Sequence, residues 1–294
     1  MLIKEEIYKS NRRYSIIQSC TLNKKDIKEL CEILKEKHGE IVDIEIREYK
    51  YPDSINELER KKKEEQIRKD FKFAIQIFGS NGSYLTGENS SVFDDKDFPK
   101  NLNLLNINNS FAYKYFRGCE PRNSFEIIIN FSETSIFYFG YPVEPINSII
   151  TVSGSNETWV TGTYQKIIDY FNSKKTSRNW IYGPVTWDIF LYTIVYPTTL
   201  WLIYKIDHYI KFRNINVSTA LSFAIYLYIF IILVHALRMI YNYSKWLYPF
   251  MEYKIENSKK LNQRKFLYAI LSIIFGPLIY DVIKTIFLKW YCPK

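Results

Sequence analysis

The sequence has few of the residues that build disulfide frameworks, zinc sites and phosphate-binding loops. Its four cysteines form no close pair and it has only three histidines, so neither a disulfide framework nor a zinc site is expected. The segment Gly79–Gly82 lacks the glycine spacing and the lysine of a P-loop, and no Gly-x-Ser-x-Gly motif occurs. We therefore predict no catalytic residues, no cofactor and no metal, and we favour a protein that is not an enzyme.

Formal charge is absent from residues 214–237, NINVSTALSFAIYLYIFIILVHAL. An α-helix rises about 1.5 Å per residue, so about 20 residues cross a hydrocarbon core of about 30 Å. A helix also satisfies its own backbone polar groups in lipid. The run predicts a membrane-spanning helix over about 216–238.

The N-terminal segment, MLIKEEIYKSNRRYS, lacks the apolar core of a signal peptide. We expect the first domain to lie in the cytosol with reduced thiols. The excess of Lys, Asn, Ile and Tyr suggests an AT-rich genome, which is compatible with a bacterium.

The net charge of +9, from 40 basic and 31 acidic residues, suits contact with anionic lipid or nucleic acid. The most charged stretch, Asn56–Asp70, has nearly balanced signs and contains no aromatic residue that could stack on a base. It is typical of a solvated helix or a flexible connection, and nucleic acid is disfavoured as a partner.

The first residues predict a β-α-β opening. Residues 13–21 are typical of a strand. Four apolar residues then recur at i, i+3, i+4 and i+7, the spacing of one helix face: Ile27, Leu30, Cys31 and Leu34. Gly39 predicts the end of this helix. The alternation over residues 42–46 (VDIEI) predicts a second strand.

Residues 71–154 favour strands over helices. Apolar residues alternate or cluster in seven short runs: FKFAIQIF, SYLTG, LNLLNIN, FAYKYF, SFEIIINF, SIFYF and SIITVSG. A turn at 79–82 joins the first two. A helix follows from Asn156, with an apolar face of Val160, Tyr164, Ile167, Ile168 and Phe171. We predict an α+β domain over residues 1–175, with a largely antiparallel sheet and at least two helices.

Three features of this domain have both a functional and a structural interpretation. Asp94, Asp95 and Asp97 could hold a divalent cation, but a surface acidic turn before a proline is favoured. His38 could be a base, although a histidine near a helix end suits the helix dipole without any catalytic role. Trp159 could stack on a ligand, but a core or interface position is the favoured interpretation.

Residues 176–294 predict an all-α transmembrane region. In addition to the central span, apolar runs over about 185–205 and 266–288 are long enough to cross a membrane. Pro197 would kink the first of these, and an interfacial or re-entrant helix is its alternative. We predict that the segment from Arg238 to Lys265 is a basic loop.

Counting basic residues predicts the orientation. If all three helices cross, one side holds ten lysines and arginines and the other five. The positive-inside rule then places the N-terminal domain and the second loop in the cytosol of a multi-pass protein, in a bacterial inner or plasma membrane. Four basic residues of that loop should face anionic lipid headgroups: Lys259, Lys260, Arg264 and Lys265. A phosphate site shared with the soluble domain is the competing interpretation.

Ionisable residues within predicted spans are candidates for function. Four occur: Asp188, His235, Asp281 and Lys284. One interpretation is an ion or proton path through these four residues. Interfacial positions, snorkelling and a structural Asp281–Lys284 pair at i, i+3 explain them without function and are favoured. Three helices are too few to line a pore, so a conducting species would be a homo-oligomer.

Three functions fit these observations. The first is a membrane-anchored sensor or effector, whose cytosolic domain binds an unknown protein or small molecule. The layout of a sensing domain followed by a small helical bundle is similar to that of bacterial membrane effectors that compromise the envelope, although this is an analogy of layout alone. The second is a membrane-bound enzyme with its site in the cytosolic domain. The third is an oligomeric transport or channel component.

Overall fold

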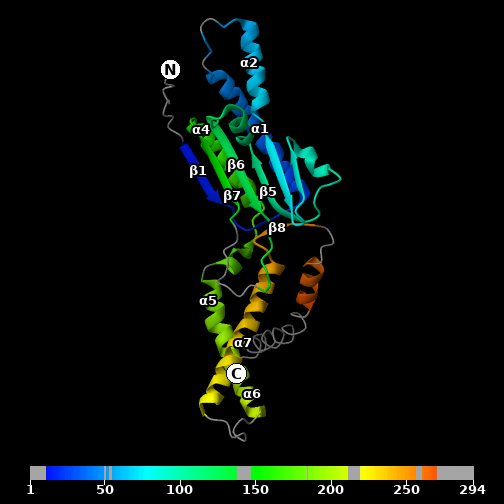
Figure 1. Cartoon of the computed structure of the whole chain (residues 1–294), viewed down its shortest axis with the longest axis vertical. Coiled ribbons are helices and arrows are strands. Elements are labelled where there is room, and N and C mark those ends of the chain that lie inside the picture. The colour runs from blue at the N-terminus through cyan, green and yellow to red at the C-terminus, as the bar shows by residue number, and fades with distance from the viewer. Residues whose placement is uncertain are drawn as a thin grey trace, which may run out of the picture. The chain divides into compact units, whose positions relative to one another are not determined.

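The computed structural model of this chain describes residues 11–49, 51–52, 55–137, 147–183, 185–210, 219–255 and 260–269. The chain divides into two compact units, Met1–Tyr253 and Lys254–Lys294. The first unit contains a sheet domain and a helical hairpin (Figure 1).

The sheet domain is built on a six-stranded antiparallel sheet, as predicted, with strand order β1-β7-β6-β5-β3-β4. The turn between β3 and β4 contains Gly82, whose φ of 82° favours glycine. The strands are β1 (Asn11–Ile16), β3 (Ala74–Gly79), β4 (Tyr84–Gly87), β5 (Leu102–Asn108), β6 (Asn123–Asn130) and β7 (Ile149–Gly154).

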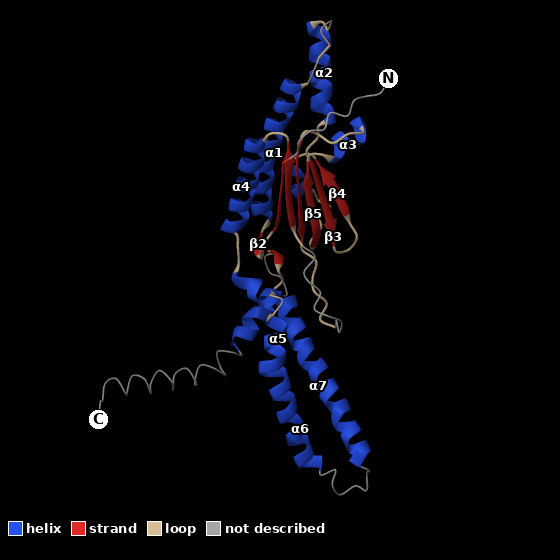
Figure 2. Cartoon of the chain, turned by 90° about the vertical axis from the view of Figure 1, so that its left-hand side faces the viewer, coloured by secondary structure: helices blue, strands red, loops and turns tan. Residues whose placement is uncertain are grey.

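Helices α1 and α4 lie against one face of this sheet (Figure 2). Asn156 caps α4 by accepting from the Trp159 backbone N–H, as the predicted helix start requires. The helices of the domain are α1 (Lys24–Glu48), α2 (Glu57–Asp70), the 3₁₀ turn η1 (Ser90–Asp94), α3 (Phe111–Arg117) and α4 (Glu157–Ser173). Of the two interpretations left open for Asn56–Asp70, a solvated helix or a flexible connection, the structure shows the helix, α2.

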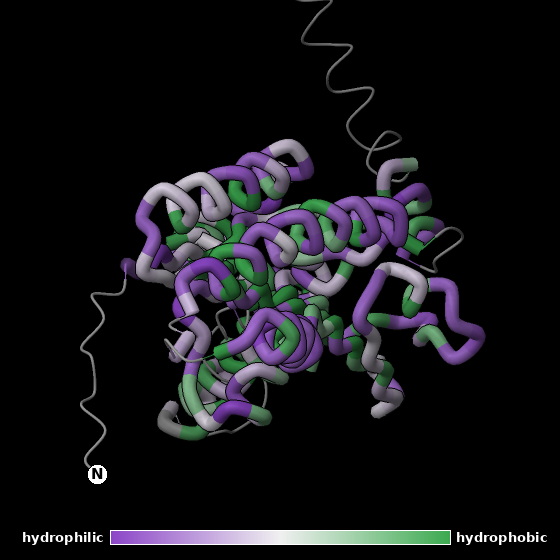
Figure 3. The backbone as a smooth tube through the Cα atoms, turned by 90° about the horizontal axis from the view of Figure 1, so that it is seen from above, coloured by the Kyte–Doolittle hydropathy of each residue, from purple (hydrophilic) through white to green (hydrophobic). Residues whose placement is uncertain are grey.

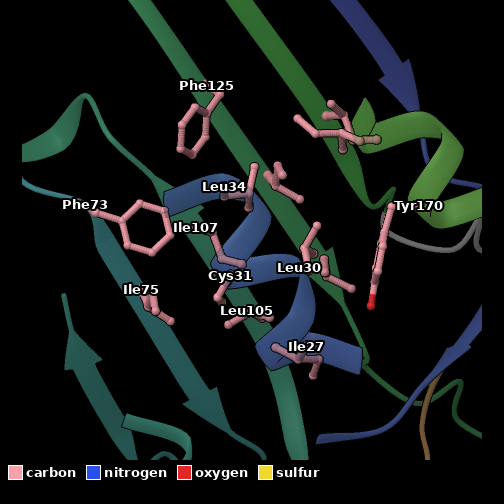
Figure 4. Packing of buried hydrophobic residues seen from close by; sticks show 14 of the residues in the cluster. Ile27, Leu30, Cys31, Leu34, Phe73, Ile75, Leu105, Ile107, Phe125 and Tyr170 are labelled. Atoms are coloured by element: carbon pink, nitrogen blue, oxygen red, sulfur yellow. The ribbon is translucent and has the colours of Figure 1, made fainter. Parts of the chain in front are cut away.

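The core lies between this helical layer and the sheet. Leu30 and Leu34 of α1 belong to the same core cluster as Leu105 and Ile107 of β5, and all four are fully buried (Figure 4). Hydrophilic residues dominate the outer sides of the helices, and hydrophobic residues gather between the layers (Figure 3). The period of 3.6 in α1 and the period of 2 in β5 therefore place both apolar faces in one core.

The predicted strand at residues 42–46 is wrong, because α1 continues without a break to Glu48. Gly39 does not end the helix; a glycine inside a helix costs only about 1 kcal/mol relative to alanine. Ile41, Val42 and Glu45 continue the buried helical face. Tertiary packing of this face outweighs both the glycine and the local alternation.

The predicted strand FAYKYF is also wrong, because these residues form α3. Asn108 Oδ1 accepts from the Phe111 backbone N–H at 3.2 Å, and Gly118 ends the helix in the left-handed region at φ 68°. Tyr113 is the only buried residue of α3. Of the predicted strand SIFYF, residues 135–137 are not in a strand, and 138–139 lie outside the described residues.

The helical hairpin consists of two apolar helical stretches. The first runs through α5 (Thr186–Phe190), the π-helical turn η3 (Leu191–Val195) and α6 (Tyr196–Ile210); the second is α7 (Thr219–Leu247). Proline has no N–H and its ring clashes with the carbonyl four residues earlier, so a widened turn directly before Pro197 is the expected response. Thr186–Asp207 and Leu221–Leu247 are long and apolar enough to cross a membrane.

The two stretches are antiparallel. The ring centroids of Trp187 and Tyr241 are 5.0 Å apart, and those of Tyr196 and Phe230 are 5.9 Å apart. The prediction that a loop begins at Arg238 is wrong, because α7 continues to Leu247. Its last turns are stabilised by burial of residues such as Tyr241 and Leu247.

After α7 the chain forms β8 (Met251–Tyr253), which pairs in parallel with β2 (Cys20–Leu22). In the second unit, residues 260–269 are helical. Most of the third predicted span, 266–288, lies outside the described residues.

Candidate functional site at the base of the helical hairpin

The sheet domain holds both ends of the hairpin. The first end is the 3₁₀ segment η2 (Ser177–Tyr182), next to Ser19. The Ser19 backbone N–H donates to Asn179 Oδ1 at 2.9 Å, and the Thr176 N–H donates to the Ser19 carbonyl at 2.8 Å. These bonds fix the segment that leads into α5.

The second end is β8, which enters the core of the sheet domain. Cys20 faces Met251 in the β2–β8 pair, and the Cys20 thiol donates to Met251 Sδ at 3.7 Å. Burial raises the pKa of Cys20 to about 12, so this thiol stays neutral. The ring of Tyr253 lies 6.0 Å from that of Phe131 and 6.3 Å from that of Phe98.

An ion pair joins the two ends directly. Arg178 Nη1 of η2 lies 2.5 Å from Glu252 Oε2 of β8, and the two side chains are only 19% and 11% exposed. Arg178 also donates to the Pro249 carbonyl at 3.4 Å, and Thr21 Oγ1 donates to Glu252 at 3.4 Å. Because the pair is largely shielded from water, removing either partner leaves an uncompensated charge.

Tyrosine hydroxyls link η2 to α7. Tyr182 donates to the carbonyls of Lys245 at 2.8 Å and Tyr248 at 3.1 Å. The last carbonyls of a helix have no partner within it, so the single Tyr182 O–H, shared between these two carbonyls, supplies a donor at the end of α7. Burial raises the pKa of Tyr182 to about 12, so the hydroxyl keeps its proton. Tyr241 donates in turn to the Ile181 carbonyl at 2.8 Å.

The segment after β6 makes a third connection. Trp246 Nε1 donates to Glu133 at 2.7 Å, and Asn242 Nδ2 donates to the Ile136 carbonyl at 3.3 Å. Strand β6 lies between β7 and β5 in the sheet. We call η2, β8, residues 131–137 and the end of α7, with the contacts that join them, the hairpin base. Its described residues contain no arrangement of a nucleophile and a base.

Of the four predicted intramembrane residues, the structure describes Asp188 and His235. Asp188 is exposed in the first turn of α5, and His235 is exposed on α7 with Nδ1 2.8 Å from the Ile231 carbonyl. Tyr241 packs beside Trp187, and His235 lies six residues before Tyr241, so it is about 9 Å from the level of Trp187 along the helix axis. Asp281 and Lys284 lie outside the described residues.

The predicted basic cluster belongs to the second unit. Lys260, Arg264 and Lys265 lie on its helical residues 260–269, and Lys260 and Arg264 share a face at i, i+4. Lys259 lies outside the described residues.

The acidic turn pairs with lysines. Asp94 lies 3.2 Å from Lys24 Nζ and 2.5 Å from Lys28 Nζ. Within the described ranges, no three His, Cys, Asp or Glu side chains are grouped to hold a metal ion. Asp95 accepts from the backbone N–H of Asp97 at 2.9 Å, which is a turn contact.

His38 is half-buried, and Trp159 lies in the core. The expected position of His38 near a helix end is wrong, because it sits in the middle of α1 with its ring 5.5 Å from that of Phe71 and 5.9 Å from that of Phe73. Burial lowers the pKa of His38 to about 4, so the ring is neutral at physiological pH. Trp159 is part of the core cluster, the structural interpretation favoured for it.

The residues of the hairpin base were not predicted as site residues. Arg178 is only one of the ten basic residues counted for the orientation. Its partner Glu252 lies far along the chain, and a three-residue strand such as β8 carries no periodic signal. Only pairing between distant parts of the chain brings these residues together, and no local sequence spacing predicts that pairing.

A polar row on the opposite sheet face also went unpredicted. Asn106 Nδ2 donates to Gln76 Oε1 at 3.2 Å and to Glu126 Oε1 at 3.4 Å, while Gln76 Nε2 donates to the Tyr84 hydroxyl at 3.4 Å. The row crosses β4, β3, β5 and β6. Its groups largely satisfy one another, which favours a structural role.

No family model, no curated protein and no solved structure matches this chain.

Proposed function

We propose that this protein is a membrane-anchored sensor or effector in which the hairpin α5–α7 inserts into a lipid bilayer. The sheet domain would lie on the cytosolic side and bind a ligand or partner. The hairpin base would pass the state of this domain to the helices. The observation that supports coupling is the Arg178–Glu252 ion pair, because it joins the segment entering the hairpin to the strand that follows it.

Two further features support insertion. The apolar residues of α7 face outward, and side chains such as Phe223 and Tyr228 are among the exposed large hydrophobic residues. In water such a surface would be unfavourable, whereas in hydrocarbon it is not. An antiparallel hairpin also returns the chain to the side on which it entered, which agrees with one domain holding both ends.

Inducible expression in bacteria with a membrane-potential dye tests the effector proposal. We expect the full chain to stay in the membrane pellet after carbonate extraction and to depolarise the cells. Arg178→Glu places two acids together in the hairpin base and should abolish depolarisation without releasing the protein. The matched control is Arg12→Glu, since Arg12 is exposed on the edge strand β1.

Release of the wild-type chain by carbonate would contradict membrane insertion. Retention without any change of potential would contradict the effector role. Equal depolarisation by wild type and Arg178→Glu would show that the hairpin acts without the sheet domain.

A further inference from the structure

Two cations of α7 pack on aromatic rings in the hairpin base. Lys245 Nζ lies 5.0 Å from the ring centroid of Tyr241 and 5.2 Å from that of Tyr182. The Arg238 guanidinium lies 5.2 Å from the ring centroid of Trp187. The rings of Trp187 and Tyr241 are 5.0 Å apart, so they form a continuous aromatic wall between the two cations.

Neither cation has an anionic partner among the residues that the structure describes. Lys245 is only 5% exposed, and its charge lies close enough to that of Arg238 for the two to repel. The carboxylates of the hairpin base are engaged elsewhere, Glu252 by Arg178 and Glu133 by Trp246. An ammonium group has three hydrogen-bond donors, and burying a cation without a partner costs free energy. An external anion would accept from these donors and pair with the charge.

The position along α7 indicates which anion is at hand. From Leu221 to Leu237 the helix carries no formal charge and rises about 26 Å, close to the thickness of a hydrocarbon core. Once the hairpin is inserted, Arg238 and Lys245 lie in the layer of lipid headgroups. Tryptophan and tyrosine favour the same layer.

We propose that the hairpin base binds the phosphate of an anionic phospholipid headgroup, with Lys245 and Arg238 supplying the donors and Trp187 and Tyr241 the wall behind them. The inference rests on the proposed insertion of the hairpin. Cationic donors make charge-assisted hydrogen bonds to phosphate oxygens, and one phosphate between the two cations reduces their repulsion. A free phosphate ion offers the same chemistry.

Native mass spectrometry of the full chain in detergent tests the site. Phosphatidylglycerol and phosphatidylcholine are titrated separately, because choline neutralises the phosphate of the second lipid. We expect wild type to bind the first phosphatidylglycerol about fivefold tighter or more than the first phosphatidylcholine. Lys245→Gln should remove this preference and Lys245→Arg should keep it.

The matched control is Lys205→Gln. Lys205 Nζ lies 5.9 Å from the ring centroid of Trp201, but this lysine is exposed and belongs to the other end of the hairpin. Lys205→Gln should keep the preference. If Lys245→Gln fails to fold by circular dichroism, Arg238→Gln carries the test and should weaken the preference.

Displacement of phosphatidylglycerol by millimolar inorganic phosphate would assign the site to the free ion, and failure to displace it assigns the site to lipid. Equal binding of the two lipids by wild type, or an equal loss in Lys205→Gln and Lys245→Gln, would overturn the proposal. Carbonate extraction distinguishes failure of the insertion proposal from failure of the headgroup proposal. A released chain contradicts insertion, whereas a retained chain without lipid preference contradicts only the headgroup site.

Discussion

The sheet domain and the helical hairpin place their apolar residues in opposite ways. Ile75 and Ile77 of β3 are fully buried between the sheet and α1. On α7, Phe223 is 69% exposed, and no residue is buried in the most apolar 18-residue stretch of the helix. The same residue types therefore face protein in one region and the surroundings of the chain in the other. This difference is expected if water surrounds the first region and lipid the second.

The largest expected effect comes from the core of the sheet domain. Phe125→Ala should cost about 3–5 kcal/mol in the free energy of unfolding, because it leaves a cavity in the core beside Phe73. Phe223→Ala, a change of the same residue type on the outer surface of α7, should cost less than about 1 kcal/mol. Urea unfolding of the full chain in detergent, followed by circular dichroism, measures both. Equal losses would contradict the contrast between the regions.

The next expected effect is on the pH dependence of stability, and it arises in the sheet domain. Burial lowers the pKa of His38 from 6.5 to about 4, so the unfolded state takes up a proton more readily than the folded state. Stability should be unchanged by this group above about pH 6.5 and should fall as the pH drops toward 4, by at most about 3 kcal/mol. His38→Gln should remove this part of the acid sensitivity. A wild-type profile that matches the variant would contradict a buried neutral His38.

A smaller effect is expected at the connection between the regions. Glu252→Gln should destabilise the β2–β8 pair by about 2 kcal/mol, because it leaves Arg178 partly buried without its anion. Arg178→Met combined with Glu252→Met should recover much of the loss. Hydrogen exchange at Thr21 and Glu252 reports the local change. Additive losses in the double variant would show that the two charges do not interact.

The smallest effect tests the start of α4. Asn156→Ala should cost about 1 kcal/mol, because the Trp159 N–H loses its acceptor. The control is Lys166→Ala on the same helix, since the Lys166–Glu36 pair is exposed and screened by solvent and should contribute less than the cap. Thermal unfolding of both variants measures the difference.

The sequence predicts the elements whose pattern is local. Ile27, Leu30 and Leu34 define the first helix, and alternation defines β3, because each pattern repeats with the period of its own backbone. The lack of charge before Arg238 marks α7 as apolar, but not its true end, since long cationic side chains can pack along aromatic rings.

The sequence fails where two periods coincide or where pairing is distant. Residues 42–46 fit a strand and a helix equally well, and only packing decides between them. FAYKYF has a single lysine among five apolar or aromatic residues, so six residues show no clear period. The β2–β8 pair joins Cys20 to Met251 across most of the chain, and the candidate site depends on that pair.

Electron paramagnetic resonance of spin labels in liposomes tests most directly whether lipid surrounds the hairpin. One label replaces Ile231 of α7 and another replaces Leu58 of α2, residues that are 44% and 65% exposed. Both are open on the surface of the chain, so in water both would meet a soluble nickel relaxant. We predict that the label at 231 collides with oxygen and is shielded from nickel, whereas the label at 58 shows the reverse. Equal access of nickel to both labels would contradict insertion of the hairpin.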